Sequence, residues 1–142
     1  MSLQYTEKDR NTYEELISSI SSSKKETRKE IYRRVLLGKF FIDKNFNRKI
    51  EVDEIAKNAF MSEFHFFRSF KEVLGITPHQ YLLSIRLVKA YEELTNSEKF
   101  INEIAVNCGF SDIYSFSKAF KKFFGYSPSI VRTKETIQLS VI

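Results

Sequence analysis

Residues that break the backbone into turns are scarce in this chain, whose 142 residues include only four glycines and two prolines. Sandwiches and barrels of many short strands need such residues often, so their scarcity favours helices. No apolar run reaches the ~18 residues of a membrane-spanning helix, and no charged-then-apolar signal segment opens the sequence. The sequence therefore predicts an all-α, soluble and cytoplasmic protein.

Residues suited to metal binding or covalent chemistry are also few. Cys108, the single cysteine, cannot form an internal disulfide, and we interpret it as a small buried residue. His65 and His79 have no metal-ligand spacing with it. The sequence contains neither a recognisable nucleophile with its base nor a glycine-rich phosphate loop. We therefore expect no enzymatic activity, no metal site and no cofactor.

Charge is unevenly distributed along the chain. The net charge is +5, from 23 basic and 18 acidic residues. Residues 1–28 carry five of each sign, so the whole basic excess lies in residues 29–142. This balance suits a polyanionic partner, although many helical proteins are as basic without binding nucleic acid.

Two segments have the spacing of long helices. From Glu30 to Lys44, large apolar residues recur at steps of three to five, as in a helix with one buried face. Thr77 followed by Pro78 is a helix start, and helical spacing then continues to Thr95. The second segment is expected to form a long central helix.

An internal repeat becomes visible when residues 51–78 are aligned with residues 100–128. The first copy has Glu54, Ile55, Ala56, Asn58, Ser62, Phe66, Phe70, Lys71, Gly75 and Pro78. The second has Glu103, Ile104, Ala105, Asn107, Ser111, Phe116, Phe120, Lys121, Gly125 and Pro128. The offset is 49 residues up to the serine and 50 from the first phenylalanine onward. We place the extra residue near the start of the later helix of the second copy.

Each copy has the pattern of a short helix, a tight turn and a second helix. In the second copy, Gly109 suits a left-handed turn residue and Ser111 is expected to cap the next helix. Phe116, Phe120 and Phe123 are expected to form one buried stripe, and Phe66 and Phe70 its counterpart in the first copy. Small Ala56 and Ala105 stand where paired helices approach closely. This pattern is typical of a helix-turn-helix unit.

With these residues, the stretch from Glu30 to Arg132 resembles the DNA-binding domain of the AraC/XylS family of bacterial transcription regulators. The most specific part comprises Ile104, Ala105, Gly109, Phe110, Asp112, Phe116, Ser117, Phe120, Lys121, Lys122, Gly125, Tyr126, Ser127 and Pro128. The resemblance implies about seven helices in a homeodomain-like arrangement of two helix-turn-helix subdomains joined by a long central helix. It implies recognition helices at 62–74 and 112–124 and a rigid connector at 78–95. Phe60 departs from the pattern, because a bulky residue there occupies a costly backbone region.

We accordingly divide the chain into five parts. They are a linker or N-terminal extension at 1–28, a first helix-turn-helix subdomain at 29–78, a connecting helix at 78–97, a second subdomain at 98–133 and a tail at 134–142. The expected function is sequence-specific DNA binding by a transcriptional regulator that inserts two recognition helices into successive major-groove segments. Expected partners are double-stranded DNA and RNA polymerase, with no membrane. A sensor or dimerisation domain is expected to precede this chain.

The outward residues of the two recognition helices are the candidate site. They are Ser62, Glu63, Phe64, His65, Phe67, Arg68 and Lys71 in the first unit, and Ser111, Ile113, Tyr114, Ser115, Lys118, Lys121 and Lys122 in the second. Arg68 suits bidentate contact with guanine, and Phe64 and Phe67 suit thymine methyl groups. Arg86 in the connector is expected to join the subdomains through Asp112.

An alternative function remains open at this stage. A helical adaptor that binds another protein through exposed aromatic residues such as Phe64 and Phe67 would share the same pattern. The lysines of the second recognition helix would then form only a solvated face. The salt dependence of binding separates the two hypotheses, because only phosphate contacts make affinity fall steeply with salt.

Overall fold

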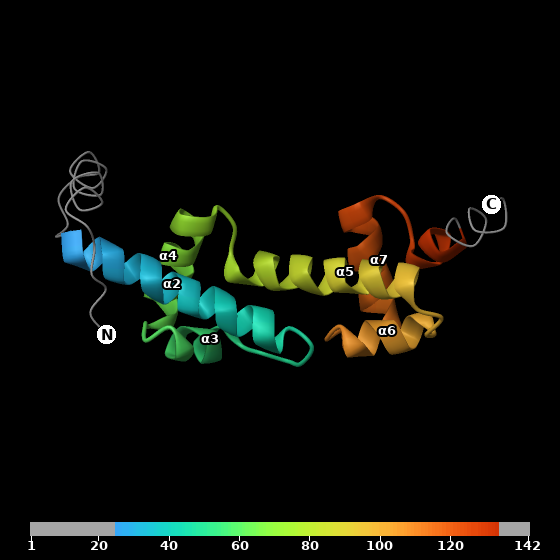
Figure 1. Ribbon diagram of the computed structural model, residues 1–142, viewed down its shortest axis with the longest axis horizontal. Coiled ribbons are helices and arrows are strands. Elements are labelled where there is room, and N and C mark those ends of the chain that lie inside the picture. The colour runs from blue at the N-terminus through green and yellow to red at the C-terminus, as the bar shows by residue number, and fades with distance from the viewer. Residues whose placement is uncertain (1–24, 134–142) are drawn as a thin grey trace.

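A computed structural model describes residues 25–133 as a succession of helices (Figure 1). The helices are α2 (Lys25–Asn45), α3 (Val52–Asn58), α4 (Glu63–Leu74), α5 (Pro78–Asn96), α6 (Ile101–Asn107) and α7 (Ile113–Phe124). Residues 128–133 are helical again, and no strand occurs between residues 25 and 133. The predicted all-α fold of two helix-turn-helix units on a central helix is confirmed. Most of the predicted N-terminal extension and the tail at 134–142 lie outside the described residues.

Two separate hydrophobic cores hold the helices together. The first contains Val35, Ile42, Ile50, Ile55, Ala56, Ala59, Phe66, Phe70 and Leu82. The second contains Leu87, Ala90, Leu94, Ile104, Ala105, Cys108, Phe116, Phe120 and Val131. The four phenylalanines expected inside are fully buried, and truncating such a side chain typically costs about 3–5 kcal/mol.

The first core depends on a close approach between α2 and α4. Gly38 on α2 is buried, and a Cβ atom there would lie only 2.6 Å from Cζ of Phe66. The absence of a side chain at Gly38 therefore lets the Phe66 ring pack against the helix backbone. Phe66 and Phe70 then contact each other, with ring centroids 5.4 Å apart.

Helix α5 spans both cores and begins as the sequence predicted. Thr77 and Gln80 form a reciprocal capping box, and Pro78 occupies the first turn. Leu82 belongs to the first core, whereas Leu87 belongs to the second. The helix ends at Asn96, one residue beyond the predicted end.

The turn between α3 and α4 has the strained residue that the sequence predicted. Phe60 has a φ of 57° and an exposed side chain, in a backbone region that costs a non-glycine residue roughly 1–2 kcal/mol. Arg34 on α2 donates a hydrogen bond of 2.9 Å to the Phe60 carbonyl. That contact satisfies a turn carbonyl and helps hold the strained conformation.

The turn between α6 and α7 corrects one expectation. The N-cap of α7 is Asp112, whose carboxylate accepts from the Ser115 backbone N–H at 2.7 Å. Ser111, predicted as the cap, is instead the extra residue of the second copy and lies within the turn. Its hydroxyl donates to the Asp112 carboxylate. The insertion thus precedes the helix, so α4 and α7 are equivalent along their whole length.

A second correction concerns the buried face of α7. Phe123 was predicted to lie on the stripe of Phe116 and Phe120, but half of its surface is exposed. Phe124 takes that place, with its ring centroid 4.6 Å from that of Phe120 and 5.1 Å from that of Tyr91. Phe124, four residues after Phe120, therefore packs against Tyr91 of α5, whereas Phe123, three residues after Phe120, does not join this buried stripe.

The corrected cap gives a direct test by thermal unfolding. Asp112→Ala should lower the melting temperature by a few degrees, because a backbone N–H at the start of α7 loses its acceptor. Ser111→Ala should change it much less. If the serine variant is the more damaging of the two, the assignment of the cap is wrong.

The stability of the folded chain at low pH should depend on the same residue, Asp112. The Ser115 backbone N–H lowers the pKa of the Asp112 carboxyl, so this stabilisation is present above the ordinary aspartate pKa and is lost as pH falls through the lowered value. Asp112→Asn should keep the cap and remove that part of the acid dependence.

Candidate nucleic-acid interface

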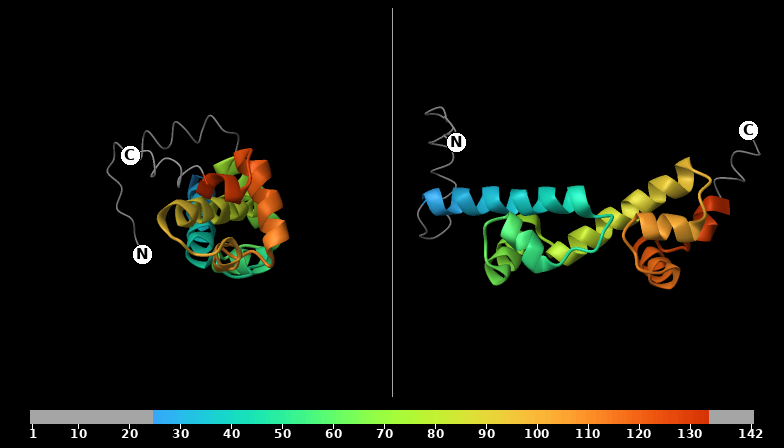
Figure 2. Two further views of the ribbon diagram at one scale, coloured as in Figure 1. Left: turned by 90° about the vertical axis from the view of Figure 1, so that its right-hand side faces the viewer. Right: turned by 90° about the horizontal axis from the view of Figure 1, so that it is seen from below.

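Helices α4 and α7 lie on the same side of the molecule. Viewed from below, both lie toward the lower edge, while α2 and the end of α5 lie toward the upper edge (Figure 2, right). The second helices of the two units therefore lie on the same side of the protein, one toward each end of its long axis (Figure 1).

Burial of two phenylalanines decides which face of α4 is available. Phe66, Ser69 and Phe70 point inward, and Ser62 caps the helix by accepting from the His65 backbone N–H. The remaining candidates are exposed, namely Glu63, Phe64, His65, Phe67, Arg68 and Lys71. Phe64 is 73% exposed, which is unusual for so large an apolar side chain.

Arg68 has partners on its own helix. Its guanidinium carbon lies 5.9 Å from the centroid of the Phe64 ring, and one terminal nitrogen is 3.9 Å from a Glu72 carboxylate oxygen. Both contacts are solvent-exposed, so they contribute little stability. The guanidinium therefore lies on the exposed face of α4 with its hydrogen-bond donors available to a partner.

Helix α7 has a different electrostatic character. It carries three lysines and no acidic residue, whereas the charges of α4 cancel. Lys118, Lys121 and Lys122 are all exposed, and none pairs with a carboxylate of residues 25–133. This end of the shared face is therefore positively charged.

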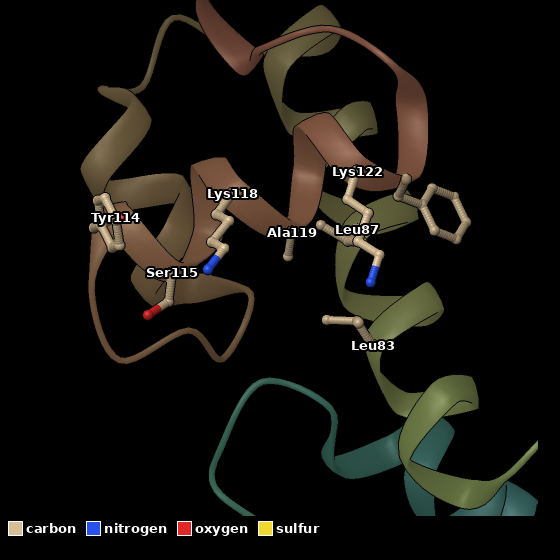
Figure 3. Close-up of a pocket in the computed structure, with 8 residues that line it drawn as sticks. Leu83, Leu87, Tyr114, Ser115, Lys118, Ala119 and Lys122 are labelled. Atoms are coloured by element: carbon tan, nitrogen blue, oxygen red, sulfur yellow. The ribbon is translucent and has the colours of Figure 1, made fainter.

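A groove lies between α5 and the outward side of α7 (Figure 3). Its volume is about 630 Å³, and its lining is Leu83, Leu87, Tyr114, Ser115, Lys118, Ala119, Lys122 and Phe123. Lys118 and Lys122 stand on either side of Ala119, over a floor to which Leu83 and Leu87 contribute. The groove combines an apolar floor with two cationic groups, which suits the sugar and phosphate of a polyanion.

All fourteen candidate site residues are exposed. Twelve of them lie on α4 and α7, while Ser62 immediately precedes α4 and Ser111 lies in the second turn. Ser111 lies in the turn and not at the start of α7, where it was predicted to cap the helix. Asp112 occupies that start with a carboxylate, which opposes a phosphate there.

Arg86 forms hydrogen bonds, but not with the expected partner. Its guanidinium donates 2.8 Å hydrogen bonds to the carbonyls of Phe46 and Arg48, in the loop between α2 and α3. Asp112, the predicted partner, instead accepts hydrogen bonds from Ser111 and Ser115. The predicted pairing of Arg86 with Asp112 is therefore wrong, and the hydrogen bonds of Arg86 join the connecting helix to the first unit.

Sequence reasoning missed several residues of this face. Asp112 could have been found by aligning the copies backward from Phe66 and Phe116, which places it opposite Ser62. Leu83, Leu87 and Phe123 carried no comparable signal, because helical periodicity alone makes each of them a core residue.

Other chemistry is poorly supported in the described part of the chain. Residues 25–133 contain no cluster of three or more histidine, cysteine or acidic side chains that could hold a metal ion. None of their helices combines the length and the apolarity needed to cross a membrane. Cys108 is almost fully buried in the second core, as expected, and burial raises the pKa of its thiol to about 11.

Two helix-turn-helix units with their second helices on one side define the class of helix-turn-helix DNA-binding domains. A family model described as "Helix-turn-helix domain" matches residues 55–134. The chain belongs to the AraC/XylS family, as the sequence resemblance implied.

Curated relatives include two bacterial regulators. The probable transcriptional regulator LumQ of Photobacterium leiognathi is 39% identical over 89 residues, which are 63% of this chain and 36% of that protein. The transcriptional activator RhaS of Escherichia coli is 35% identical over 92 residues, 65% of this chain and 33% of that protein. The matched region thus spans about a third of each relative. Their names agree with the expectation that this chain is not an enzyme.

Solved structures share the fold. The C-terminal domain of AraT, a response regulator from Geobacillus stearothermophilus, has a TM-score of 0.69 at 33% identity, covering 71% of this chain and 84% of that one. An AraC-type regulator from Chromobacterium violaceum has a TM-score of 0.67 at 28% identity, covering 72% and 91%. The DNA-binding domain of AdpA, solved with a target DNA, has a TM-score of 0.70 at 25% identity, covering 73% and 94%.

The raised pKa of Cys108 predicts slow thiol chemistry. At pH 8 an aromatic disulfide reagent should modify the folded chain at least ~100-fold more slowly than the urea-unfolded chain, because only the thiolate reacts. Between pH 8 and pH 10 the folded rate should keep rising, since the pKa of the buried thiol is about 11. A folded rate that levels off by pH 9 would contradict this.

Proposed function

We propose that this chain is the DNA-binding part of a sequence-specific transcriptional regulator and inserts α4 and α7 into successive major-groove segments of one duplex. The observation that carries the proposal is that the outward faces of α4 and α7 lie on one side of the protein (Figure 2). Successive major-groove segments on one side of a duplex are about 34 Å apart. Two helices on a common support can meet them together.

Helix α4 is suited to read bases. The Arg68 guanidinium lies on the exposed face beside Phe64, where a base edge can reach it. A guanidinium fork matches O6 and N7 of guanine, worth about 1–3 kcal/mol of discrimination. Phe64 and Phe67 offer apolar contacts for thymine methyl groups. His65 adds a side chain that reaches a base or a phosphate.

Helix α7 is suited to hold the backbone. Lys118, Lys121 and Lys122 supply charge for phosphates without a competing carboxylate in the helix, and phosphate contacts position a protein without reading sequence. Ile113, Tyr114 and Ser115 at its start provide the contacts closest to bases. Tyr114 is 76% exposed, which leaves its whole ring available to a partner.

The remaining assignments belong to the same proposal. Residues 29–78 and 98–133 are the two binding units, residues 78–97 are the connector, and residues 1–28 and 134–142 are an extension and a tail. The relatives are about three times longer than the matched region, which supports a sensor or dimerisation domain elsewhere in the full protein. In this proposal the regulator contacts RNA polymerase and works in the cytoplasm.

Salt titration separates DNA binding from the adaptor alternative. On a duplex selected from a random pool, the affinity of the chain should fall steeply between about 50 and 200 mM salt, with a log–log slope of several units. Each phosphate contact releases counterions, so the slope counts such contacts. A flat response would favour the protein-binding adaptor.

Single substitutions should divide the two helices by role. Arg68→Ala should relax the preference at one base pair, whereas Lys121→Ala should weaken binding on all duplexes and reduce the salt slope by about one. Arg33→Ala is the matched control. It removes one exposed charge from α2, outside the two recognition helices. Equal losses on every sequence for both test variants would contradict the division of roles.

A further inference from the structure

Each unit packs on its own stretch of α5, and the two units share no hydrophobic core among residues 25–133. Leu82 is the last α5 residue buried in the first core, and Leu87 is the first in the second. Leu83, which follows Leu82 directly, already packs against the second core, so the two units adjoin on α5. Long helices curve gently, so a contact made beside this part of α5 helps to hold the two units in one relative orientation.

Arg86 lies on α5 between Leu82 and Leu87, and its side chain links this part of the helix to the first unit. It leaves α5 and donates to the carbonyls of Phe46 and Arg48, both at 2.8 Å. These carbonyls belong to the first unit, some 40 residues earlier in the chain. Hydrogen bonds from a charged donor are about twice as strong as neutral ones. The fork of the guanidinium also fixes direction as well as distance.

The loop that accepts these bonds is itself braced. The Arg48 side chain pairs with Glu54 on α3 at 2.7 Å and donates to the Lys49 carbonyl at 3.1 Å. Asn45 donates to the Phe41 carbonyl at 2.8 Å. Arg86 is therefore anchored to a loop whose position follows α2 and α3, rather than to a freely moving segment.

The second unit closes over this contact through Gly109. A Cβ atom at Gly109 would lie 2.7 Å from Nε of Arg86 and would also clash with the Phe46 carbonyl oxygen. Phe60, at the equivalent position of the first unit, also has a positive φ, yet its side chain points into solvent. A left-handed turn alone thus admits a large residue. At position 109 the close approach to Arg86 and Phe46 adds to the backbone strain that any side chain would have at a φ of +94°.

We propose that Phe46, Arg48, Arg86 and Gly109 form a junction clamp that sets the spacing between the two DNA half-sites, with Arg86 as the positioning residue. The effect on half-site spacing rests on the proposed function, whereas the contacts of the clamp are present in the protein without DNA. Two linked binding units gain affinity only when their separation matches that of their targets. A clamped junction therefore confines high affinity to one spacing.

The first test needs no DNA. Spin labels at Glu72→Cys on α4 and Lys121→Cys on α7 report the distance between the helices, and labelling at pH 7 leaves the buried Cys108 thiol unmodified. The doubly labelled chain without further substitutions, the parent, should give one narrow distribution of distances between the two labels. Arg86→Gln should broaden it at least twofold, and Arg86→Lys should do the same, because lysine retains the charge but lacks the fork.

Gly109→Ala and Phe60→Ala provide the matched pair. Both place alanine at the same turn position, but only the first intrudes on the clamp, so only the first should shift or broaden the distances. If Arg86→Gln fails to fold, Arg86→Lys and Gly109→Ala carry the test. Narrow, unshifted distributions in the folded Arg86 and Gly109 variants would overturn the clamp.

The second test uses duplexes with one base pair inserted or removed between the half-sites, and duplexes with a single half-site. The parent should lose affinity at least ~10-fold on either change of spacing. Arg86→Lys should shrink that penalty to under ~3-fold while binding single half-sites like the parent. An unchanged spacing penalty would overturn the clamp. Failure of the parent to bind any duplex would overturn the proposed function alone, because the distance measurements stand independently.

Discussion

A single helix must complete two hydrophobic cores, and the rest of the structure depends on this constraint. Each helix-turn-helix unit is too small to bury its own phenylalanine pair. Leu82 of α5 completes the first core, and Leu87, Ala90 and Leu94 complete the second. The rotational phase of α5 therefore decides how each unit is oriented. The common direction of α4 and α7 is a consequence of that phase.

Burial of the aromatic pairs then determines the chemistry of the exposed face. Because Phe66 and Phe70 occupy one stripe of α4, the 100° rotation per residue leaves Phe64, Phe67 and Arg68 on the surface. The same argument applied to Phe116 and Phe120 leaves the lysines of α7 outside. Packing energy in the core thus selects the side chains that a partner meets. The two faces differ because the outward residues of the two helices differ, with Arg68 and Glu72 on α4 and Lys118 and Lys122 at the equivalent positions of α7.

Sequence periodicity predicted most of this architecture, and it failed where several geometries satisfy the same pattern. Helix bounds, buried phenylalanines and the left-handed Gly109 follow from spacing and turn chemistry. Phe123 and Phe124 both lie one turn after Phe120, so only the packing against α5 distinguishes them. In the sequence, the one-residue insertion of the second copy could lie before or after the N-cap. For that reason Ser111, rather than Asp112, was wrongly predicted to be the cap. Arg86 binds carbonyl oxygens, which every residue carries, so no sequence pattern could identify its partners.

The two repeats show how equivalent local structure acquires unequal constraints. Phe60 and Gly109 occupy the same turn with positive φ, yet their surroundings are opposite. The first turn faces solvent, where a hydrogen bond from Arg34 holds the strained carbonyl. The second faces Arg86 and the Phe46 carbonyl, where even a methyl group has no room. At position 109 the positive φ of the turn and the close approach of the two units therefore both favour glycine.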